Sequence, residues 1–399
     1  MVSNKVGVAF FDTVTRAVSG HKYLDGKLEL FESIGELDNG VIWITNVPYS
    51  AFKEQQLWSY PNLRDEQYAR LSITQLIREV GGRSRKDLGV LETVGYLVTK
   101  ALYKLCEQFP IDLSLENYRV SKALAPHIIP HIYQSFPSGI DINCIEACTN
   151  AFKALQGAHK SKQTKAQLLY FTFPRPNFYA YLLNQSFPLS NDWKHVQFTE
   201  RMTIGNADGE SLPNSDAVVN KLKKMHVTDA LLLKVNVRKI DKRYMQGFNF
   251  SNVGMSKNVK PRVWATLPEI IDLSRYCHIE IIEGYKTAGG PLDIRPELDL
   301  SAIRYDYSQG ITAENIFNAL VEKVGFQNRD VYTGLSAYLK AYDRLVCGKL
   351  AEAFMKEGFL LGGFGMAGVR VWAPKDKESE LKEIASNYGA YMDVGVSDD

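Results

Sequence analysis

The chain has 399 residues, a formal net charge of +2, and 45% hydrophobic and 23% charged residues. This length exceeds that of a single small module, and the composition is close to that of an average globular protein. A mainly disordered, repetitive or low-complexity chain is therefore excluded. A net charge this small does not indicate a nucleic-acid partner by itself.

The N-terminal segment contains a short apolar run that Asp12 and Arg16 interrupt, which is not typical of a signal peptide. No later stretch reaches the roughly 18 consecutive apolar residues that a membrane-spanning helix needs. We therefore expect a cytoplasmic protein, of a cell or of an infected host cell, with no membrane partner.

The five cysteines are an odd number and form no Cys-x-x-Cys pair, so free thiols are expected. Cys144 and Cys148 lie one helical turn apart, with His159 downstream. A zinc site would need a fourth ligand and tighter spacing, and no metal site is predicted.

In the first part of the chain, the runs at 6–12 and 41–46 are β-branched and aromatic, which predicts buried strands, and a charged strand pair is expected around Leu28–Ser33. From Glu66 to Phe109 the apolar spacing predicts a helix. A second helical region is expected at 118–165, with breaks at Pro126, Pro130 and Pro137.

In the second part, strands and helices alternate, and some strands pair as hairpins. The expected strands are 168–173, 229–237, 278–285 and a strand-turn-strand at 358–373, and the expected helices are Asn177–Asn184, Pro268–Ser274, 313–324 and 334–357. A surface loop is predicted at 205–216 and a polar tail at the end. This mixture predicts an α+β fold.

Three N-terminal segments share the layout of metal-binding exonuclease motifs. FFDTVTR at 10–16 has Asp12 but Val14 in place of a Glu, and TNVPYSAF at 45–52 has Asn46 and Tyr49 but Ser50 in place of an Asp. RSRKDLGVLE at 83–92 keeps Asp87 and has Arg83 in place of a Tyr. In this order, these segments resemble the exonuclease motifs of protein-primed family B DNA polymerases, which phages, viruses and linear plasmids encode.

The later segments continue the resemblance. YFTFPRPNFYAYLLNQSFPLS at 170–190 is similar to the strand and helix that carry the first catalytic Asp of the family, with Phe173 in its place. In 314–325, Asn318 and Lys323 fit the fingers helix that grips the incoming nucleotide, whereas Glu314 replaces its Lys. Residues 341–374 resemble the palm helix and the hairpin that bears catalytic Asp residues, but here the tip reads Gly365, Met366, Ala367, Gly368.

The resemblance implies three domains: an exonuclease-like, RNase H-like domain at 1–115, a helical connecting region at 116–165, and a palm- and fingers-like domain at 166–399. Because the chain ends soon after the hairpin, where the family carries a thumb, we expect the thumb to be missing.

The departures from the family pattern bear on catalysis. Nucleotide transfer uses two magnesium ions held by carboxylate oxygens. Those ligands are absent at the degenerate positions Val14, Ser50, Phe173, Gly365 and Ala367. We therefore expect a non-catalytic protein without a cofactor. Because Asp12 and Asp87 remain, a residual magnesium-dependent nuclease is an alternative, as is a polymerase completed by a partner subunit.

Positive residues cluster along the chain. A solvated surface is the commoner meaning of such a run, but four clusters interleaved with aromatic residues make contact with a phosphate backbone a competing interpretation. The predicted nucleic-acid-binding residues are Lys160, Lys162, Lys165, Lys223, Lys224, Arg238, Lys239, Lys242, Arg243, Lys257, Lys260, Arg262, Asn318 and Lys323.

The function predicted from the sequence is that of an inactive polymerase-like protein of a virus or mobile element. It would bind nucleic acid, with DNA favoured, or assemble with other proteins. A capsid-like or scaffold-like homo-oligomer is the main alternative of a different class.

Overall fold

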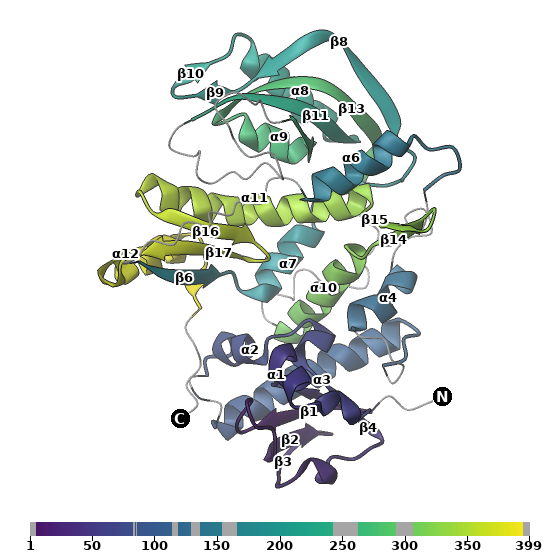
Figure 1. Cartoon of the computed structure of the whole chain (residues 1–399), viewed down its shortest axis with the longest axis vertical. Helices are drawn as coiled ribbons and strands as arrows, with labels where there is room; N and C mark the ends of the chain where they lie inside the picture. Colours follow the sequence, from purple (N-terminus) through teal and green to yellow (C-terminus); the bar gives the residue numbers. More distant parts are fainter. Residues whose placement is uncertain are drawn as a thin grey trace.

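Figure 1 shows the computed structural model of the chain, which describes residues 5–82, 84, 86–113, 119–128, 136–153, 166–241, 262–292 and 306–393. An N-terminal sheet lies at one end of the elongated molecule, a second sheet lies at the other end, and a third sheet lies between them beside the long helix α11 (Figure 1). The architecture is a mixed α+β fold, as the sequence predicts. The predicted domain boundaries stay predictions.

The N-terminal sheet has the strand order β3-β2-β1-β4-β5, with β1 antiparallel to β2 and parallel to β4. Its strands are β1 (Lys5–Phe11), β2 (Gly20–Leu24), β3 (Lys27–Phe31), β4 (Val41–Thr45) and β5 (Leu63–Arg64). Successive side chains of β1 alternate between the two faces, so that Val8 and Phe10 join the main core while Ala9 and Phe11 join a smaller one. The predicted strands at 6–12 and 41–46 are confirmed, whereas the strand pair begins earlier than expected.

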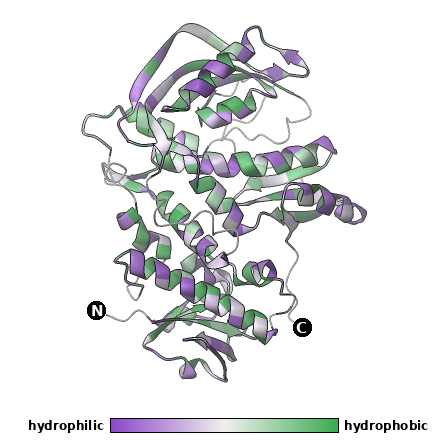
Figure 2. Ribbon diagram, turned by 180° about the vertical axis from the view of Figure 1, so that it is seen from behind, coloured by the Kyte–Doolittle hydropathy of each residue, from purple (hydrophilic) through white to green (hydrophobic). Residues whose placement is uncertain are grey.

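Helices cover this sheet and connect it to the rest of the chain. They are α1 (Tyr49–Glu54), α2 (Ile73–Glu79), α3 (Leu88–Gln108), α4 (Val120–Ile128) and α6 (Ile142–Lys153), with 3-10 turns at Ile34–Glu36, Leu57–Ser59 and Glu66–Ala69. Hydrophobic and hydrophilic residues succeed one another along the long helices, as expected for helices with one buried side (Figure 2).

The helical pattern predicted from Glu66 to Phe109 is confirmed along the stripe at 88–105, which lies on α3, but to take the segment as one unbroken helix would be wrong. The segment divides into a 3-10 turn, α2 and α3, and Gly81 between the two helices has a φ of +87°, which few residues other than glycine adopt. The predicted break at Pro126 is also wrong, because this residue lies inside α4. Pro126 is exposed on the outer side of this short helix, near its C-terminal end. Pro130 lies outside the described residues.

The second sheet has the order β12-β11-β13-β7, and β8 also pairs with β13. Its strands are β7 (Ser186–Pro188), β8 (Lys194–Ile204), β11 (Asp229–Ile240), β12 (Arg262–Thr266) and β13 (Cys277–Pro291), and α8 (Ser215–Met225) and α9 (Leu267–Leu273) pack beside it. The predicted loop at 205–216 is in part wrong, since it contains the hairpin of β9 (Asn206–Ala207) and β10 (Glu210–Ser211) and the start of α8.

The third sheet has the order β16-β17-β6-β18 and is antiparallel. Its strands are β6 (Gln167–Thr172), β16 (Leu360–Gly365), β17 (Gly368–Ala373) and β18 (Tyr391–Met392). The helices near it are α7 (Arg175–Leu183), α10 (Tyr307–Leu320), α11 (Gly334–Lys356) and α12 (Glu378–Asn387), and the small hairpin of β14 (Val324–Phe326) and β15 (Arg329–Val331) follows α10. The predicted polar tail is wrong for 378–392, which forms α12 and β18.

All five cysteines lie in the described part of the chain and are free thiols, four of them buried. Every helix described is too short or too polar to cross a lipid bilayer.

Candidate nucleic-acid interface

The tip of the β16–β17 hairpin is fixed by a carboxylate from a neighbouring helix. Gly365, Met366 and Ala367 all have positive φ angles, which aim consecutive backbone N–H groups at the same point. Asp343 of α11 occupies that point: its Oδ2 accepts from the Met366 amide at 2.8 Å and its Oδ1 from the Ala367 amide at 3.1 Å. Lys340 Nζ lies 3.5 Å from the same carboxylate. The tip is therefore held by hydrogen bonds and carries no acidic side chain of its own.

The end of β6 meets this tip. The Phe173 amide donates to the Ala367 carbonyl oxygen at 2.9 Å, and the Thr172 hydroxyl donates to the same oxygen at 3.1 Å. The Phe173 ring is buried and stacks on Phe178, with 5.7 Å between ring centroids. The fold thus brings the degenerate positions Phe173, Gly365 and Ala367 together, and an aromatic side chain and backbone groups fill the place.

A buried ion pair lies beneath the same region. Arg175 of α7 donates to Glu314 Oε2 of α10 at 2.9 Å, and Tyr179 donates to Glu314 Oε1 at 3.3 Å. Burial raises the pKa of Glu314, although Arg175 opposes the rise. Burial would lower the pKa of Arg175, but Glu314 and Glu79 outweigh it, so this pKa is raised. Glu314, which stands where the resemblance implies a Lys, is a buried partner of Arg175.

Two adjoining cavities surround the hairpin tip. One, of ≈ 590 Å³, lies between α7, α10 and the hairpin, and the other, of ≈ 920 Å³, extends toward α4 and the β14–β15 hairpin. Both are lined by Arg70, Asn318, Lys340 and Met366, so they are continuous. We call the two together the basic cleft, because cations outnumber acids in its lining. The cations are Arg70, Arg119, Lys122, Arg175, Lys323, Lys340, Arg344 and Arg370, and the acids are Glu314, Glu322, Asp330 and Asp343.

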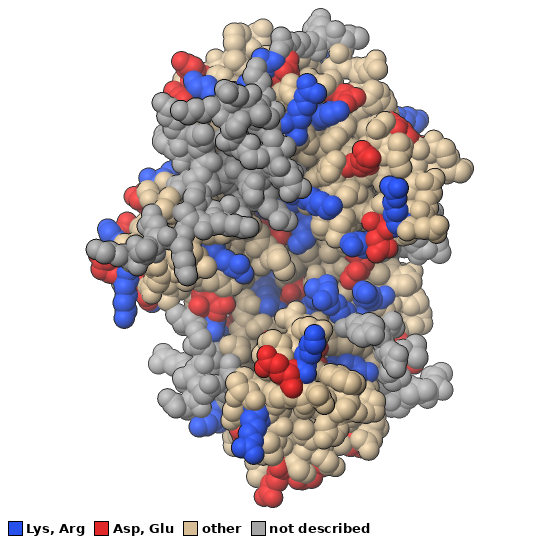
Figure 3. Space-filling view, in the orientation of Figure 1, with Lys and Arg blue, Asp and Glu red and all other residues tan. Residues whose placement is uncertain are grey.

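Lys and Arg side chains gather around the hollow across the middle of the molecule (Figure 3). Burial lowers the pKa of Arg70, and the neighbouring charge of Arg119 lowers it further, while Glu322 and Glu314 act in the opposite direction. Arg70 lies 3.9 Å from Glu322, so its charge is partly offset, whereas Lys122, Lys323 and Arg370 of the cleft have no ion pair within the described residues. Such a site favours an anionic ligand.

Aromatic rings support the cations of the basic cleft. Lys323 lies over the Tyr332 ring, with 5.8 Å from Nζ to the ring centroid, and Tyr332 stacks on Phe152 at a centroid distance of 3.6 Å. Arg370 lies over Tyr170 at 5.7 Å. At the floor, the side chain of Met366 is 73% exposed. The cleft thus combines positive charge with apolar surface.

The residues predicted to bind nucleic acid do not lie on one common surface among the residues that the structure describes. Asn318 and Lys323 line the basic cleft, although Lys323 lies beyond the end of α10 and not on the expected helix. Lys223 lines another cavity, and Lys224 is exposed on α8. The remaining predicted residues Lys160, Lys162, Lys165, Lys242, Arg243, Lys257 and Lys260 lie outside the described part of the chain.

Three predicted cations lie on the second sheet, where each has a partner. Arg238 pairs with Glu280, and Lys239 pairs with Glu210 at 2.9 Å and Asp208 at 3.5 Å. Arg262 donates to the Asn236 side chain at 3.2 Å. Whether these residues bind nucleic acid stays a prediction.

The exonuclease-like positions have local partners. Asp12 accepts from the Ser19 hydroxyl at 3.3 Å, and Asp87 caps α3 by accepting from the Val90 amide. The Val14 carbonyl accepts from Gln55, and Ser50 is exposed in the first turn of α1. Within the residues that the structure describes, no group of three or more His, Cys, Asp or Glu side chains is arranged to hold a metal ion.

Several residues of the site do not stand out in the sequence. Asp343, Arg175 and Arg70 lie in segments whose apolar pattern dominates, and Lys122 and Arg370 are isolated cations. The one available signal is an acid such as Asp343 in the middle of a helix that is otherwise buried, because a buried carboxylate needs hydrogen-bond donors.

Comparisons with protein families and with curated proteins find no match for this chain. Among solved structures, Phi29 DNA polymerase complexed with primer-template DNA is similar, with a TM-score of 0.41 and 11% identity over 94% of this chain and 82% of that chain. The same polymerase complexed with single-stranded DNA gives a TM-score of 0.42 and 10% identity over the same shares. This is a distant structural similarity over most of the chain, and it assigns neither a family nor an activity.

Proposed function

We propose that the protein binds nucleic acid in the basic cleft without transferring nucleotides. The observation that carries the proposal is the continuity of two cavities lined by eight Lys and Arg side chains, against four acidic ones, from separate parts of the chain. Cations that neutralise phosphates release counterions and supply most of the sequence-independent affinity for nucleic acid. The cleft therefore suits a strand whose sequence is not read.

The apolar parts of the cleft suit unpaired bases. Exposed Met366 lies at the hairpin tip, and the stacked rings of Phe152 and Tyr332 lie in the wall. Proteins that bind single strands combine a positive groove with aromatic rings on which bases stack. We therefore favour a single-stranded segment, and DNA is the nucleic acid that the motif resemblance favours.

The absence of nucleotide transfer follows from the side chains around the hairpin tip. A two-metal mechanism needs carboxylates that face the reacting phosphate. At the tip and at the end of β6 the side chains are those of Met366, Ala367 and Phe173. Asp343, the acid that contacts the tip, uses both carboxylate oxygens for backbone amides. Lys340, 3.5 Å from the same carboxylate, would repel a metal ion there.

The test is the binding of fluorescent single- and double-stranded DNA and single-stranded RNA across a salt series, with primer extension in magnesium alongside. We expect binding that weakens as salt rises, and no extension. The double variant Lys122→Ala/Lys323→Ala should weaken binding about ten- to a hundredfold and lower the salt slope by about 1–2.

The matched control is Lys224→Ala, which removes an exposed lysine that does not line the cleft. This variant should bind DNA as the unchanged protein does. Equal losses in both variants, or no binding at all, would contradict the proposal, and primer extension would contradict its non-catalytic part. In the absence of binding, light scattering would test the alternative prediction of a large homo-oligomer.

A further inference from the structure

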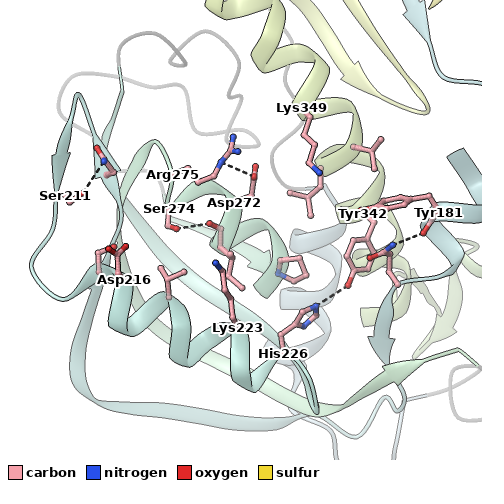
Figure 4. A pocket seen from close by; sticks show the side chains of 18 residues that line it. Tyr181, Ser211, Asp216, Lys223, His226, Asp272, Ser274, Arg275, Tyr342 and Lys349 are labelled. Carbon is pink, nitrogen blue, oxygen red and sulfur yellow. Dashed lines mark hydrogen bonds and ion pairs between the residues drawn. The ribbon is translucent and has the colours of Figure 1, made fainter. Parts of the chain in front are cut away.

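A separate cavity lies on the opposite side of α11 from the basic cleft. It has a volume of ≈ 560 Å³ and is enclosed by α7, α8, α9 and α11 (Figure 4). We call it the α8–α11 cavity and define it by Tyr181, Val219, Lys223, Ile271, Tyr342 and Lys349. Its volume lies within the range of about 300–1,000 Å³ that is typical of small-molecule sites.

One wall of this cavity is apolar. Val219 of α8, Ile271 of α9, and Leu345 and Val346 of α11 are each only partly buried, so they present apolar surface to the cavity. The Tyr181 ring from α7 is 49% exposed at the edge. A ligand with a planar apolar body would remove this surface from water, which is favourable.

Two lysines extend toward the cavity from opposite walls. Lys223 comes from α8 and Lys349 from α11 (Figure 4). Both are exposed, and neither has an ion pair within 4 Å among the residues that the structure describes, although Lys349 is near enough to Asp272 to act on the pKa of that carboxyl. Two ammonium groups on facing walls suit a phosphate group, which carries close to two negative charges and several acceptor oxygens.

The other charged residues of the cavity either have partners of their own or lie far from Lys223 along α8. Asp272 accepts from the Tyr276 hydroxyl at 2.7 Å and pairs with Arg275 at 3.4 Å, and Arg275 also pairs with Glu352. Asp216 lies seven residues before Lys223 on α8, which places it about 10 Å away along the helix axis. The charge available to a ligand beside the two lysines is therefore positive.

Neutral polar groups line the inner end. The Tyr342 hydroxyl donates to the Ser186 carbonyl oxygen at 2.6 Å and lies 3.4 Å from His226 Nε2. Burial lowers the pKa of His226, so the ring is neutral near pH 7 and does not compete with the lysines for an anion. The groups around Tyr342 and His226 are therefore neutral, and the cavity combines them with the apolar wall and the charged lining residues.

We propose that the α8–α11 cavity binds a small phosphorylated molecule with a planar apolar body, with the phosphate between Lys223 and Lys349 and the body against the apolar wall. This site is distinct from the basic cleft and does not depend on nucleic-acid binding there. The sequence groups Lys223 with its neighbour Lys224 as one basic cluster, but the fold turns only Lys223 into a cavity.

The test is isothermal titration calorimetry of the full chain with AMP, adenosine and inorganic phosphate as probes. AMP should bind, and adenosine and phosphate should each bind at least about tenfold more weakly, because each lacks one half of the recognised chemistry. Lys223→Ala and Lys349→Ala should each lower the AMP affinity about tenfold. Lys224→Ala, the next residue on the same helix, should leave it unchanged.

A filling variant tests the apolar wall independently. Val219→Phe should abolish AMP binding by occupying the cavity, and if this variant does not fold, the exposed lysine variants still decide the question. Failure of AMP to bind, or unchanged affinity in both lysine variants, would overturn the proposal. DNA binding measured on the same variants should be unchanged. The test of the α8–α11 cavity is therefore independent of the test of DNA binding in the basic cleft.

Discussion

The basic cleft and the second sheet both contain many cations, but they place them differently. On the second sheet, Lys234 pairs with Glu283 at 2.7 Å, Arg238 pairs with Glu280, and Lys239 pairs with Glu210. In the basic cleft, Lys122, Lys323 and Arg370 have no ion pair within the described residues. A cluster of Lys and Arg in the sequence therefore does not by itself predict a positive surface.

The strand register explains the difference. Lys234 of β11 lies directly opposite Glu283 of β13, and Asn236 lies opposite Glu280, so cross-strand neighbours neutralise the cations. The cations of the cleft come from different elements that meet only in the folded chain: Lys122 from α4, Lys323 from the turn after α10, and Arg370 from β17. Their positive charge is set by tertiary structure.

The largest expected contrast concerns the buried pair at the cleft floor. The side chains of Arg175 and Glu314 are 14% and 9% exposed, and those of Lys234 and Glu283 are 33% and 30% exposed. Arg175→Met should lower the free energy of unfolding by about 3–5 kcal/mol, because it leaves a buried carboxylate without its partner. Lys234→Met should cost less than about 1 kcal/mol. Denaturant titrations give both values, and equal costs would contradict the comparison.

A second contrast concerns the carboxylate that holds the hairpin tip. Asp343→Asn replaces one acceptor oxygen by an amide donor, so one of the two buried backbone N–H groups loses its partner. We expect a loss of about 1–3 kcal/mol of stability. Glu283→Gln on the second sheet is the matched change of an exposed carboxylate and should cost less. Thermal unfolding of the two variants measures the difference, and a neutral Asp343→Asn would mean that the tip does not depend on this carboxylate.

The third contrast compares unpaired with paired cations in DNA binding. Lys122→Ala/Arg370→Ala should weaken the binding of single-stranded DNA about tenfold. Arg238→Ala/Lys239→Ala removes the same formal charge from the second sheet, where carboxylates already offset it, and should change binding little. Fluorescence anisotropy at constant salt measures both. A larger effect from the second pair would move the binding surface to the second sheet.

The smallest contrast is in the pH dependence of stability. Burial raises the pKa of Glu79 near the cleft floor, whereas hydrogen bonds from Lys234 and His195 lower the pKa of Glu283. Glu79 therefore makes the protein less stable as the pH rises from the unfolded value near 4.5 through the raised folded value. Glu283 contributes stability above the unfolded value near 4.5 that is lost as the pH falls through the lowered folded value.

The two substitutions should consequently change the pH profile in opposite ways. Glu79→Gln should flatten a decline of stability on the alkaline side of pH 4.5, and Glu283→Gln should flatten a decline on the acid side. Unfolding at a series of pH values tests this. Profiles that change in the same direction would show that one of the two environments is misassigned.

The sequence predicts elements whose pattern is local. The strands at 6–12 and 41–46, the helix at 334–357 and the hairpin at 358–373 each have their own periodicity or turn residues, and the structure confirms them. It does not predict α12, whose buried apolar residues are Leu381 and Ala385 in a polar segment, so the stripe is too sparse to indicate a helix.

The candidate site is less predictable, since its contacts join distant residues. Arg175 and Glu314 are 139 residues apart in the sequence. Asp343 on α11 accepts a hydrogen bond from Met366, which lies at the tip of the β16–β17 hairpin. The sequence correctly indicates that the hairpin tip and the end of β6 lack acids, because that requires only residue identities. Which side chains surround the hairpin tip depends on packing between distant segments.

Helix α11 is a wall shared by the basic cleft and the α8–α11 cavity. Tyr342 lines the cavity, and the next residue, Asp343, holds the hairpin tip in the cleft. A displacement of this helix cannot be confined to one side, because adjacent residues share one peptide unit. Only a ligand that displaced α11 would couple the two otherwise independent cavities, and linkage requires any such coupling to be reciprocal. A small molecule that strengthens DNA binding severalfold would itself be bound more tightly by the same factor once DNA is present.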